Sequence, residues 1–134
     1  MKIAPYIHTM EPNSKNILVI DDDKDFLFLI SKTMSKQGYH VYTASNGIKA
    51  LDELSDHKID LIISDVIMLD TPIMSLTCTL KNLYPKTPII LISGLPGGPL
   101  INNTLTLGAD EFIPKPINMN LLYSTIDKLS GMAA

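Results

Sequence analysis

One apolar run that ends abruptly on a carboxylate constrains the fold of this chain more than any other stretch: Asp60-Leu61-Ile62-Ile63-Ser64-Asp65. Its consecutive apolar side chains predict a strand that is buried on both faces, as the inner strands of a parallel sheet are. Asp65 then lies at the carboxyl end of that strand. Because open α/β sheets place their binding groups at this edge, Asp65 is the first candidate functional residue.

A second run of the same kind comes earlier in the chain. Asn16-Ile17-Leu18-Val19-Ile20 is followed directly by Asp21, Asp22 and Asp23. If the two predicted strands are neighbours, two or three of these acids come close to Asp65. Carboxylates gathered so closely repel one another, and a hard divalent cation usually relieves that repulsion. We therefore expect a metal site at this edge.

The rest of the chain alternates between helical and strand patterns. Apolar spacing predicts helices and strands in turn, with helices over 26–34, 48–54, 76–83, 100–107 and 118–129 and further strands over 39–43, 88–93 and 111–113. Gly38 is predicted to end the first helix in a left-handed conformation, and Asn118 to cap the start of the last. This alternation forces parallel strands with right-handed crossovers, and so predicts an α/β domain.

Length and composition suit one domain. The chain has 134 residues, of which 46% are hydrophobic, enough for a substantial core. Residues 1–15 have the composition of a tail, and we expect a flexible leader there. We expect the domain to span 16–130 and a short tail to span 131–134. The lone Cys78 excludes an internal disulfide, and we expect it to pack in the core.

Charge and hydropathy argue against two classes of partner. The net charge is -3 and no arginine is present, whereas a nucleic-acid surface needs clustered Lys and Arg. No apolar stretch approaches the ~20 residues of a membrane span. Residues 1–12 also lack the basic and apolar regions of a signal peptide. We therefore expect a cytoplasmic protein that contacts neither nucleic acid nor membrane.

Five polar side chains follow or end the predicted strands: Asp21, Asp22, Asp65, Ser93 and Lys115. In a parallel sheet these strand ends meet at one edge. The set is what phosphoryl transfer to a carboxylate requires, because the charge on the transferred oxygens must be neutralised while an aspartate attacks phosphorus. A cation held by the acids, the lysine ammonium and the serine hydroxyl each supply a partner for a phosphoryl oxygen.

At these positions the sequence resembles the response-regulator receiver domains of two-component signalling. The resemblance covers roughly residues 16–130. It rests on four motifs in order at the family's spacing: residues 17–23 (ILVIDDD), 60–68 (DLIISDVIM), 88–94 (PIILISG) and 108–116 (GADEFIPKP). It implies a flavodoxin-like, doubly wound, five-stranded parallel sheet of strand order 2-1-3-4-5 with five helices. After Met68 the sequence departs from the family's usual proline and glycine.

The resemblance also implies roles for the acids. Asp65 would be the phosphoacceptor, taking a phosphoryl group from a histidine kinase or a phosphotransfer protein. Asp21 and Asp22 would hold Mg²⁺ together with Asp65, and the Ile67 carbonyl would complete the protein ligands. The chain would then be no turnover enzyme, because it catalyses only its own phosphorylation and dephosphorylation.

The remaining implied roles concern the response to phosphate. Ser93 and Lys115 would bind the phosphoryl group, and the bond between Lys115 and Pro116 would be cis. Ser93 and Phe112 would act as the switch. They would alter a face made by 100–107, 111–113 and the last helix, which binds a downstream protein or a second copy of the chain.

Two other functions are open at this point. A phosphorylation-independent pseudo-receiver would act only as a docking or dimerisation module, but such chains usually lack the acceptor or the lysine. A flavodoxin-like ligand-binding module would need a glycine- and hydroxyl-rich loop after the first strand. Three aspartates stand there instead, which disfavours an anionic cofactor.

Overall fold

The computed structural model describes residues 14–66, 68, 71–94 and 108–133. Five strands are present in this part of the chain: β1 (Asn16–Ile20), β2 (His40–Ala44), β3 (Leu61–Asp65), β4 (Ile89–Ser93) and β5 (Glu111–Pro114). Four helices are present in it: α2 (Lys24–Ser35), α3 (Gly47–Asp56), α4 (Ile73–Leu83) and α6 (Met119–Ala133). The predicted helix over 100–107 lies outside the described residues.

The five strands form one sheet in the order β2-β1-β3-β4-β5, and every neighbouring pair is parallel. This confirms the predicted flavodoxin-like strand order. Val19 pairs with Ile63, and Ile63 with Ile90, so the most apolar runs of the sequence form the three inner strands. All five residues of β3 and of β4 are buried, whereas the edge strand β2 is partly exposed.

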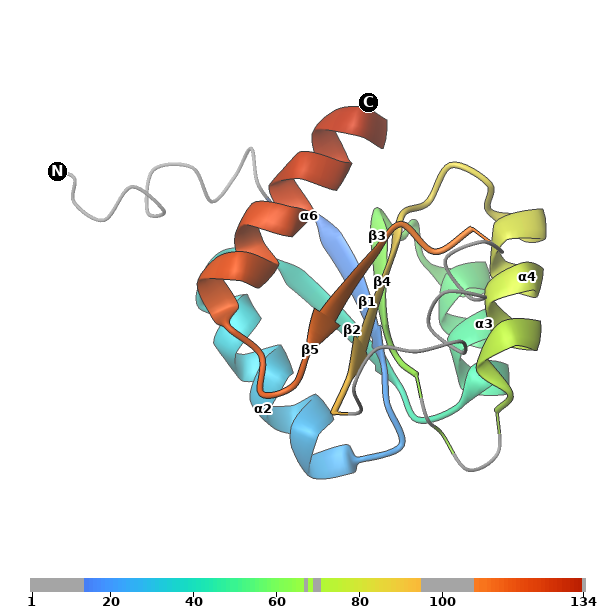
Figure 1. The fold of residues 1–134 in the computed structure, drawn as a ribbon, viewed down its shortest axis with the longest axis horizontal. Coiled ribbons are helices and arrows are strands. Elements are labelled where there is room, and N and C mark those ends of the chain that lie inside the picture. Colours follow the sequence, from blue (N-terminus) through green and yellow to red (C-terminus); the bar gives the residue numbers. More distant parts are fainter. Residues whose placement is uncertain (1–13, 67, 69–70, 95–107, 134) are drawn as a thin grey trace, which may run out of the picture.

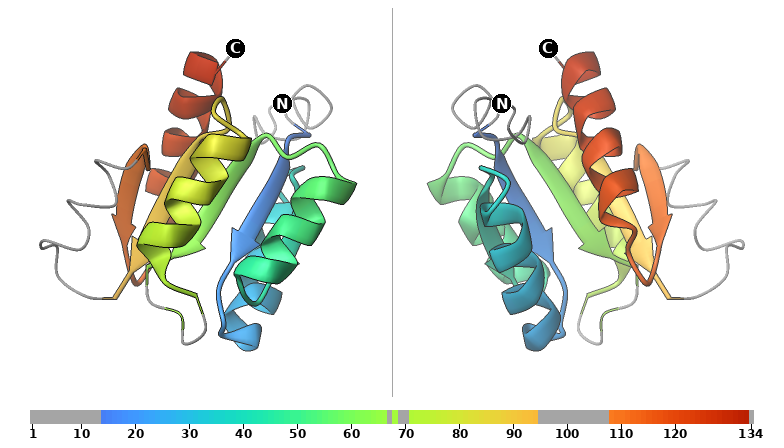
Figure 2. Two further views of the ribbon diagram at one scale, coloured as in Figure 1. Left: turned by 90° about the vertical axis from the view of Figure 1, so that its right-hand side faces the viewer. Right: turned by 90° about the vertical axis from the view of Figure 1, so that its left-hand side faces the viewer.

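Helices cover both faces of the sheet (Figures 1 and 2). Because side chains alternate along a strand, each inner strand contributes to two separate cores. Ile17 and Val19 pack in the core under α2 and α6, which also contains Leu27 and Leu122. The next residue along the strand, Leu18, packs in the opposite core under α3 and α4. The sheet is thus held between two apolar layers.

Polar side chains fix the starts of α2, α3 and α6. Asp23 is the N-cap of α2 and accepts a hydrogen bond of 3.1 Å from the Phe26 amide. Asn46 caps α3 in the same way through the Lys49 amide. Asn118 accepts from the Leu121 amide at 3.1 Å, which confirms its predicted role at the start of α6. Gly38 has a φ of 95°, the left-handed conformation that was predicted after α2.

The cap at Asn118 leads to a prediction about stability. We expect Asn118→Ala to lower the free energy of unfolding by about 1 kcal/mol, because an amide of the first turn loses its acceptor. Asn120→Ala is the matched control, since Asn120 is exposed within α6 and is not at the cap. Urea denaturation of both variants measures the difference. Equal losses would show that the Asn118 side chain does not stabilise α6.

One sequence prediction was wrong and one boundary differs. Cys78 is exposed and is not part of the core. Helix α4 buries Ile73, Leu76, Thr77 and Leu80 against the sheet, so the residue at 78 faces away from it. Helix α6 continues to Ala133, past the predicted end of the domain at residue 130. None of the helices in the described ranges has both the length and the apolar character needed to cross a bilayer.

Candidate functional site

The predicted site residues lie at the carboxyl edge of the sheet. Asp65 and Ser93 are the last residues of β3 and β4, Asp21 follows β1 and Lys115 follows β5. Backbone hydrogen bonds join these strand ends: the Val66 amide donates to the Ile92 carbonyl at 2.9 Å, and the Lys115 amide to the Ser93 carbonyl at 2.8 Å. The backbone that supports the side chains is therefore part of the sheet.

Three carboxylates converge at this edge. Asp21, Asp22 and Asp65 each offer an oxygen atom, and these atoms all lie within 4.8 Å of one another. Their environments differ: Asp21 is 1% exposed and Asp65 9% exposed, whereas Asp22 is open to solvent. The backbone amide of Asp23 donates to Asp21 Oδ1 at 2.9 Å and so fixes the orientation of the buried carboxylate.

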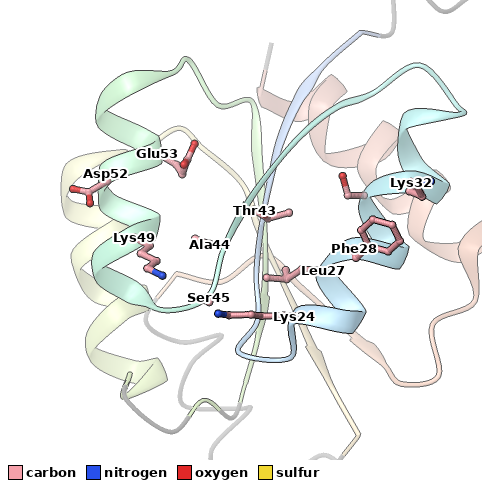
Figure 3. Close-up of a pocket in the computed structure, with 11 residues that line it drawn as sticks. Lys24, Leu27, Phe28, Lys32, Thr43, Ala44, Ser45, Lys49, Asp52 and Glu53 are labelled. Carbon is pink, nitrogen blue, oxygen red and sulfur yellow. The ribbon is translucent and has the colours of Figure 1, made fainter.

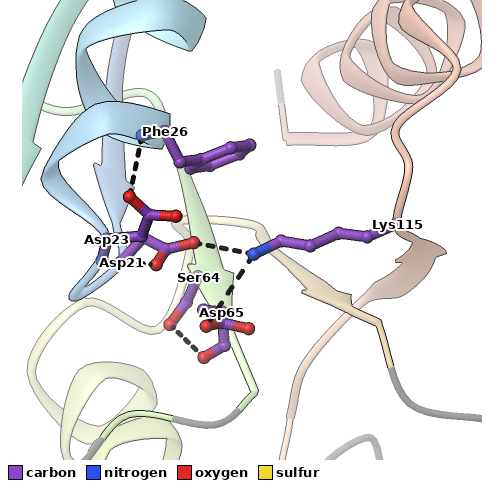
Figure 4. A network of polar contacts seen from close by, with 6 residues as sticks. All are labelled: Asp21, Asp23, Phe26, Ser64, Asp65 and Lys115. Atoms are coloured by element: carbon purple, nitrogen blue, oxygen red, sulfur yellow. Dashed lines mark hydrogen bonds and ion pairs between the residues drawn. The ribbon is translucent and has the colours of Figure 1, made fainter.

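Lys115 extends from the end of β5 toward these acids (Figure 4). Its Nζ lies 3.0 Å from Asp21 Oδ2 and 3.9 Å from Asp65 Oδ2. The bond between Lys115 and Pro116 is cis, as the resemblance implied. One ammonium thus faces two carboxylates, one after β1 and one at the end of β3, so the local charge stays negative. Asp22, in the same cluster, makes it more negative.

Phe26 is a residue that the sequence analysis missed. The sequence analysis used it only as the first residue of the helix predicted over 26–34, but its ring centroid lies 4.6 Å from Lys115 Nζ. Figure 4 shows the ring in the first turn of α2, beside the acids and facing the lysine. The one signal in the sequence was the position of Phe26. The predicted helix begins right after the three aspartates, and a side chain in its first turn must lie near them.

Ser93 and Phe112 lie on the same face of the sheet. Ser93 is buried at the end of β4. Phe112 is partly buried and packs against the core under α3 and α4, and it pairs in register with Leu91, a member of that core. Ser93 is two residues beyond Leu91 and therefore shares its face. The remaining predicted site residue, Ile67, lies outside the described residues.

The three carboxylates fit a hard divalent cation. Such cations prefer oxygen ligands, and Mg²⁺ usually takes one or two carboxylates together with water. Asp21 and Asp65 are fixed at the ends of strands, whereas Asp22 adds charge at the solvent side. The sheet holds the backbone of Asp65, and the Asp23 amide fixes the carboxylate of Asp21.

A groove lies elsewhere on the molecule (Figure 3). Its volume is about 640 Å³, and it runs along the end of β2 between α2 and α3. Lysines from both helices line it, as do two acids of α3: Lys24, Lys32, Lys49, Asp52 and Glu53. No described residue of the predicted site lines this groove. The groove is therefore separate from the predicted site.

Comparisons with known proteins agree with the geometry. The sequence profile of the response regulator receiver domain matches residues 17–127. The transcriptional regulatory protein CpxR of Escherichia coli (strain K12) is 36% identical over 114 residues, which are 82% of this chain and 47% of CpxR. The chain spans less than half the length of the curated relatives it matches. The prediction that this chain does not contact nucleic acid stays a prediction.

Solved structures share the fold. A two-component response regulator from Clostridium difficile has a TM-score of 0.81 at 27% identity, over 86% of this chain and 94% of that one. A response regulator from Burkholderia pseudomallei has a TM-score of 0.78 at 27% identity, over 88% of this chain and 69% of that one. The latter structure holds a phosphorylated aspartic acid, a calcium ion and citrate.

Proposed function

Because the chain belongs to the response regulator receiver family of two-component systems, we propose that Asp65 accepts a phosphoryl group. The donor is the phosphohistidine of a sensor histidine kinase or of a phosphotransfer protein. The observation that carries this proposal is the convergence of Lys115 and the three carboxylates, with Lys115 Nζ 3.9 Å from Asp65 Oδ2. Uptake of phosphate from a small phosphodonor, measured by intact mass, tests it.

The proposed reaction is a single displacement at phosphorus. A carboxylate oxygen of Asp65 forms a bond to phosphorus while the bond from phosphorus to the imidazole nitrogen breaks. The electron pair of that bond stays on the nitrogen, and the product is an acyl phosphate on Asp65. Since the carboxylate already exists as an anion, no general base is needed to activate it.

The side chains around Asp65 balance the charge of the transferred group. Asp21, Asp22 and Asp65, with the Ile67 carbonyl, would hold Mg²⁺, which supplies positive charge to the phosphoryl oxygens. The Lys115 ammonium meets another oxygen as a point charge. The Ser93 hydroxyl donates a hydrogen bond to a third. Each of these groups brings positive charge or a hydrogen-bond donor to the edge of the sheet where the new negative charge appears.

The phosphoryl group then changes a binding face. It brings about two negative charges and strong acceptors to the end of β3. We propose that Ser93 moves toward it and that Phe112 follows, since both side chains lie on one face of the sheet. This alters the face made by β5 and α6, which binds a downstream protein or a second copy. Residues 100–107, the third part of the face expected from the sequence, lie outside the described residues. The protein acts in the cytoplasm as a switch and turns over no separate substrate.

Mg²⁺ should stabilise the folded chain. At about ten times its dissociation constant, we expect Mg²⁺ to raise the free energy of unfolding by about 1.4 kcal/mol, because only the folded state gathers the acids. Asp22→Asn should weaken Mg²⁺ binding by at least about tenfold, since it removes a charged ligand. Urea denaturation with and without Mg²⁺ measures both effects.

The control for this prediction is Asp25→Asn. Asp25 is exposed in the first turn of α2 and lies outside the cluster, so this change removes the same charge without removing a ligand. An equal loss of Mg²⁺ stabilisation in both variants would contradict the assigned ligands. It would mean that the affinity for Mg²⁺ depends only on the net charge of this end of the molecule.

A further inference from the structure

The contact between Phe26 and Lys115 has the geometry of a cation–π interaction as well as of side-chain packing. The Lys115 ammonium touches three groups: Asp21 at 3.0 Å, Asp65 at 3.9 Å and the face of the Phe26 ring at 4.6 Å from its centroid. We infer that Phe26 is a positioning residue, which holds the Lys115 ammonium at the place where the phosphoryl oxygens arrive. This inference rests on the proposed function.

Phe26 is held both at its ring and at its backbone. Phe26 packs against the core under α2 and α6, and its backbone amide is fixed by the hydrogen bond to the Asp23 cap. Lys115, in contrast, has a long flexible side chain that is 27% exposed. Such a side chain extends its charged end into water when nothing retains it. The fixed ring therefore limits the positions that the ammonium can take.

A ring suits this task better than a further acid would. The face of an aromatic ring attracts a cation through its quadrupole but does not neutralise it. A carboxylate at the same place would pair with the ammonium and would repel the incoming phosphoryl group. Phe26 leaves the positive charge of Lys115 available for the phosphoryl oxygens. It also adds no negative charge to a cluster that already contains three carboxylates.

The same helix provides a matched control. Lys32 Nζ lies 5.1 Å from the centroid of the Phe28 ring, so α2 carries a second lysine and phenylalanine pair. Phe28 is 60% exposed and lines the groove between α2 and α3, which none of the described residues of the predicted site lines (Figure 3). A change at Phe28 removes the same type of contact at a place where it has no part in phosphoryl transfer.

The test uses Phe26→Leu, Phe26→Tyr and the control Phe28→Leu, with acetyl phosphate and Mg²⁺ as reactants. Leucine keeps an apolar side chain but has no ring, whereas tyrosine keeps the ring. We expect Phe26→Leu to lower the rate of phosphorylation by about three- to tenfold. Phe26→Tyr and Phe28→Leu should stay near the wild-type rate.

Two further measurements separate positioning from a general loss of structure. In the wild type, the ring current of Phe26 should shift the ε-methylene protons of Lys115 upfield in NMR spectra, and Phe26→Leu should abolish that shift. The affinity for Mg²⁺, measured by titration calorimetry, should not fall in Phe26→Leu. A loosened structure would instead weaken Mg²⁺ binding along with phosphorylation.

The outcomes are distinct. Wild-type chain that takes up no phosphate contradicts the proposed function itself. Normal uptake by wild type together with an unchanged rate in Phe26→Leu overturns only the positioning role. A rate that falls with a histidine kinase as donor but not with acetyl phosphate also overturns it, because Phe26 would then serve to dock the kinase. Equal loss in Phe26→Leu and Phe26→Tyr overturns it as well.

Discussion

Asp65→Asn takes up no phosphate when it is incubated with acetyl phosphate and Mg²⁺, whereas the wild-type chain gains one phosphoryl mass. This is the expected result of an intact-mass experiment, and its reason is chemical. The asparagine amide has nearly the same shape as the carboxylate but is neutral and a far weaker nucleophile. Asp21 should not replace it, because its carboxylate is buried and paired with Lys115.

Unfolding should not explain that loss. The variant removes one of three carboxylates that lie within 4.8 Å of one another, and this lessens their mutual repulsion. In the presence of EDTA we therefore expect Asp65→Asn to be at least as stable as the wild type. Asp23→Asn is the matched control: asparagine is an equally good N-cap, so this variant should keep both its fold and its phosphate uptake.

Equal uptake by Asp65→Asn and by the wild type would mean that phosphate is attached elsewhere. An absence of uptake by the wild type would favour the pseudo-receiver, a docking module that works without phosphorylation. Neither result would change the fold or the family of the chain. Both would remove the chemical role that we propose for its acidic cluster.

The strands and their parallel pairing were predictable because they depend on local sequence pattern and on a few connection rules. Ile62 and Ile90 lie in runs too apolar to be exposed on either face, so they had to be inner strands. The alternation of helix and strand then excluded antiparallel pairing. The order 2-1-3-4-5 came from the resemblance, since no periodicity in the sequence fixes which strands are neighbours.

The candidate site was predictable in its composition but not in its contacts. Strand ends meet at one edge of a parallel sheet, so the approach of Asp21 and Lys115 to Asp65 followed from topology. The ring of Phe26 beside Lys115 depends instead on how the first turn of α2 packs against the end of β5. The exposure of Cys78 was not predictable for a similar reason. Cysteine is usually buried, but the residue type alone does not show which face of α4 packs against the sheet.

Lys115→Met should slow phosphorylation by about 10²- to 10³-fold, the second large effect we expect. Methionine keeps an unbranched apolar chain but removes the charge that meets the phosphoryl oxygens, and the loss of one such donor commonly has this size. The buried Asp21 carboxylate also loses its partner at 3.0 Å. In EDTA the free energy of unfolding should therefore fall by about 1–3 kcal/mol.

The affinity for Mg²⁺ decides between this account and a collapse of the site. The ammonium repels a cation bound to the same carboxylates, so Lys115→Met should bind Mg²⁺ at least as tightly as the wild type, and Mg²⁺ should restore part of the lost stability. Lys128→Met is the control, since it removes the partner of Glu111 on the exposed side of α6 and leaves the acids unchanged. Weaker Mg²⁺ binding in Lys115→Met would show instead that the lysine supports the structure of the site. Removal of a repelling charge can lower the affinity for Mg²⁺ only if the carboxylates have moved.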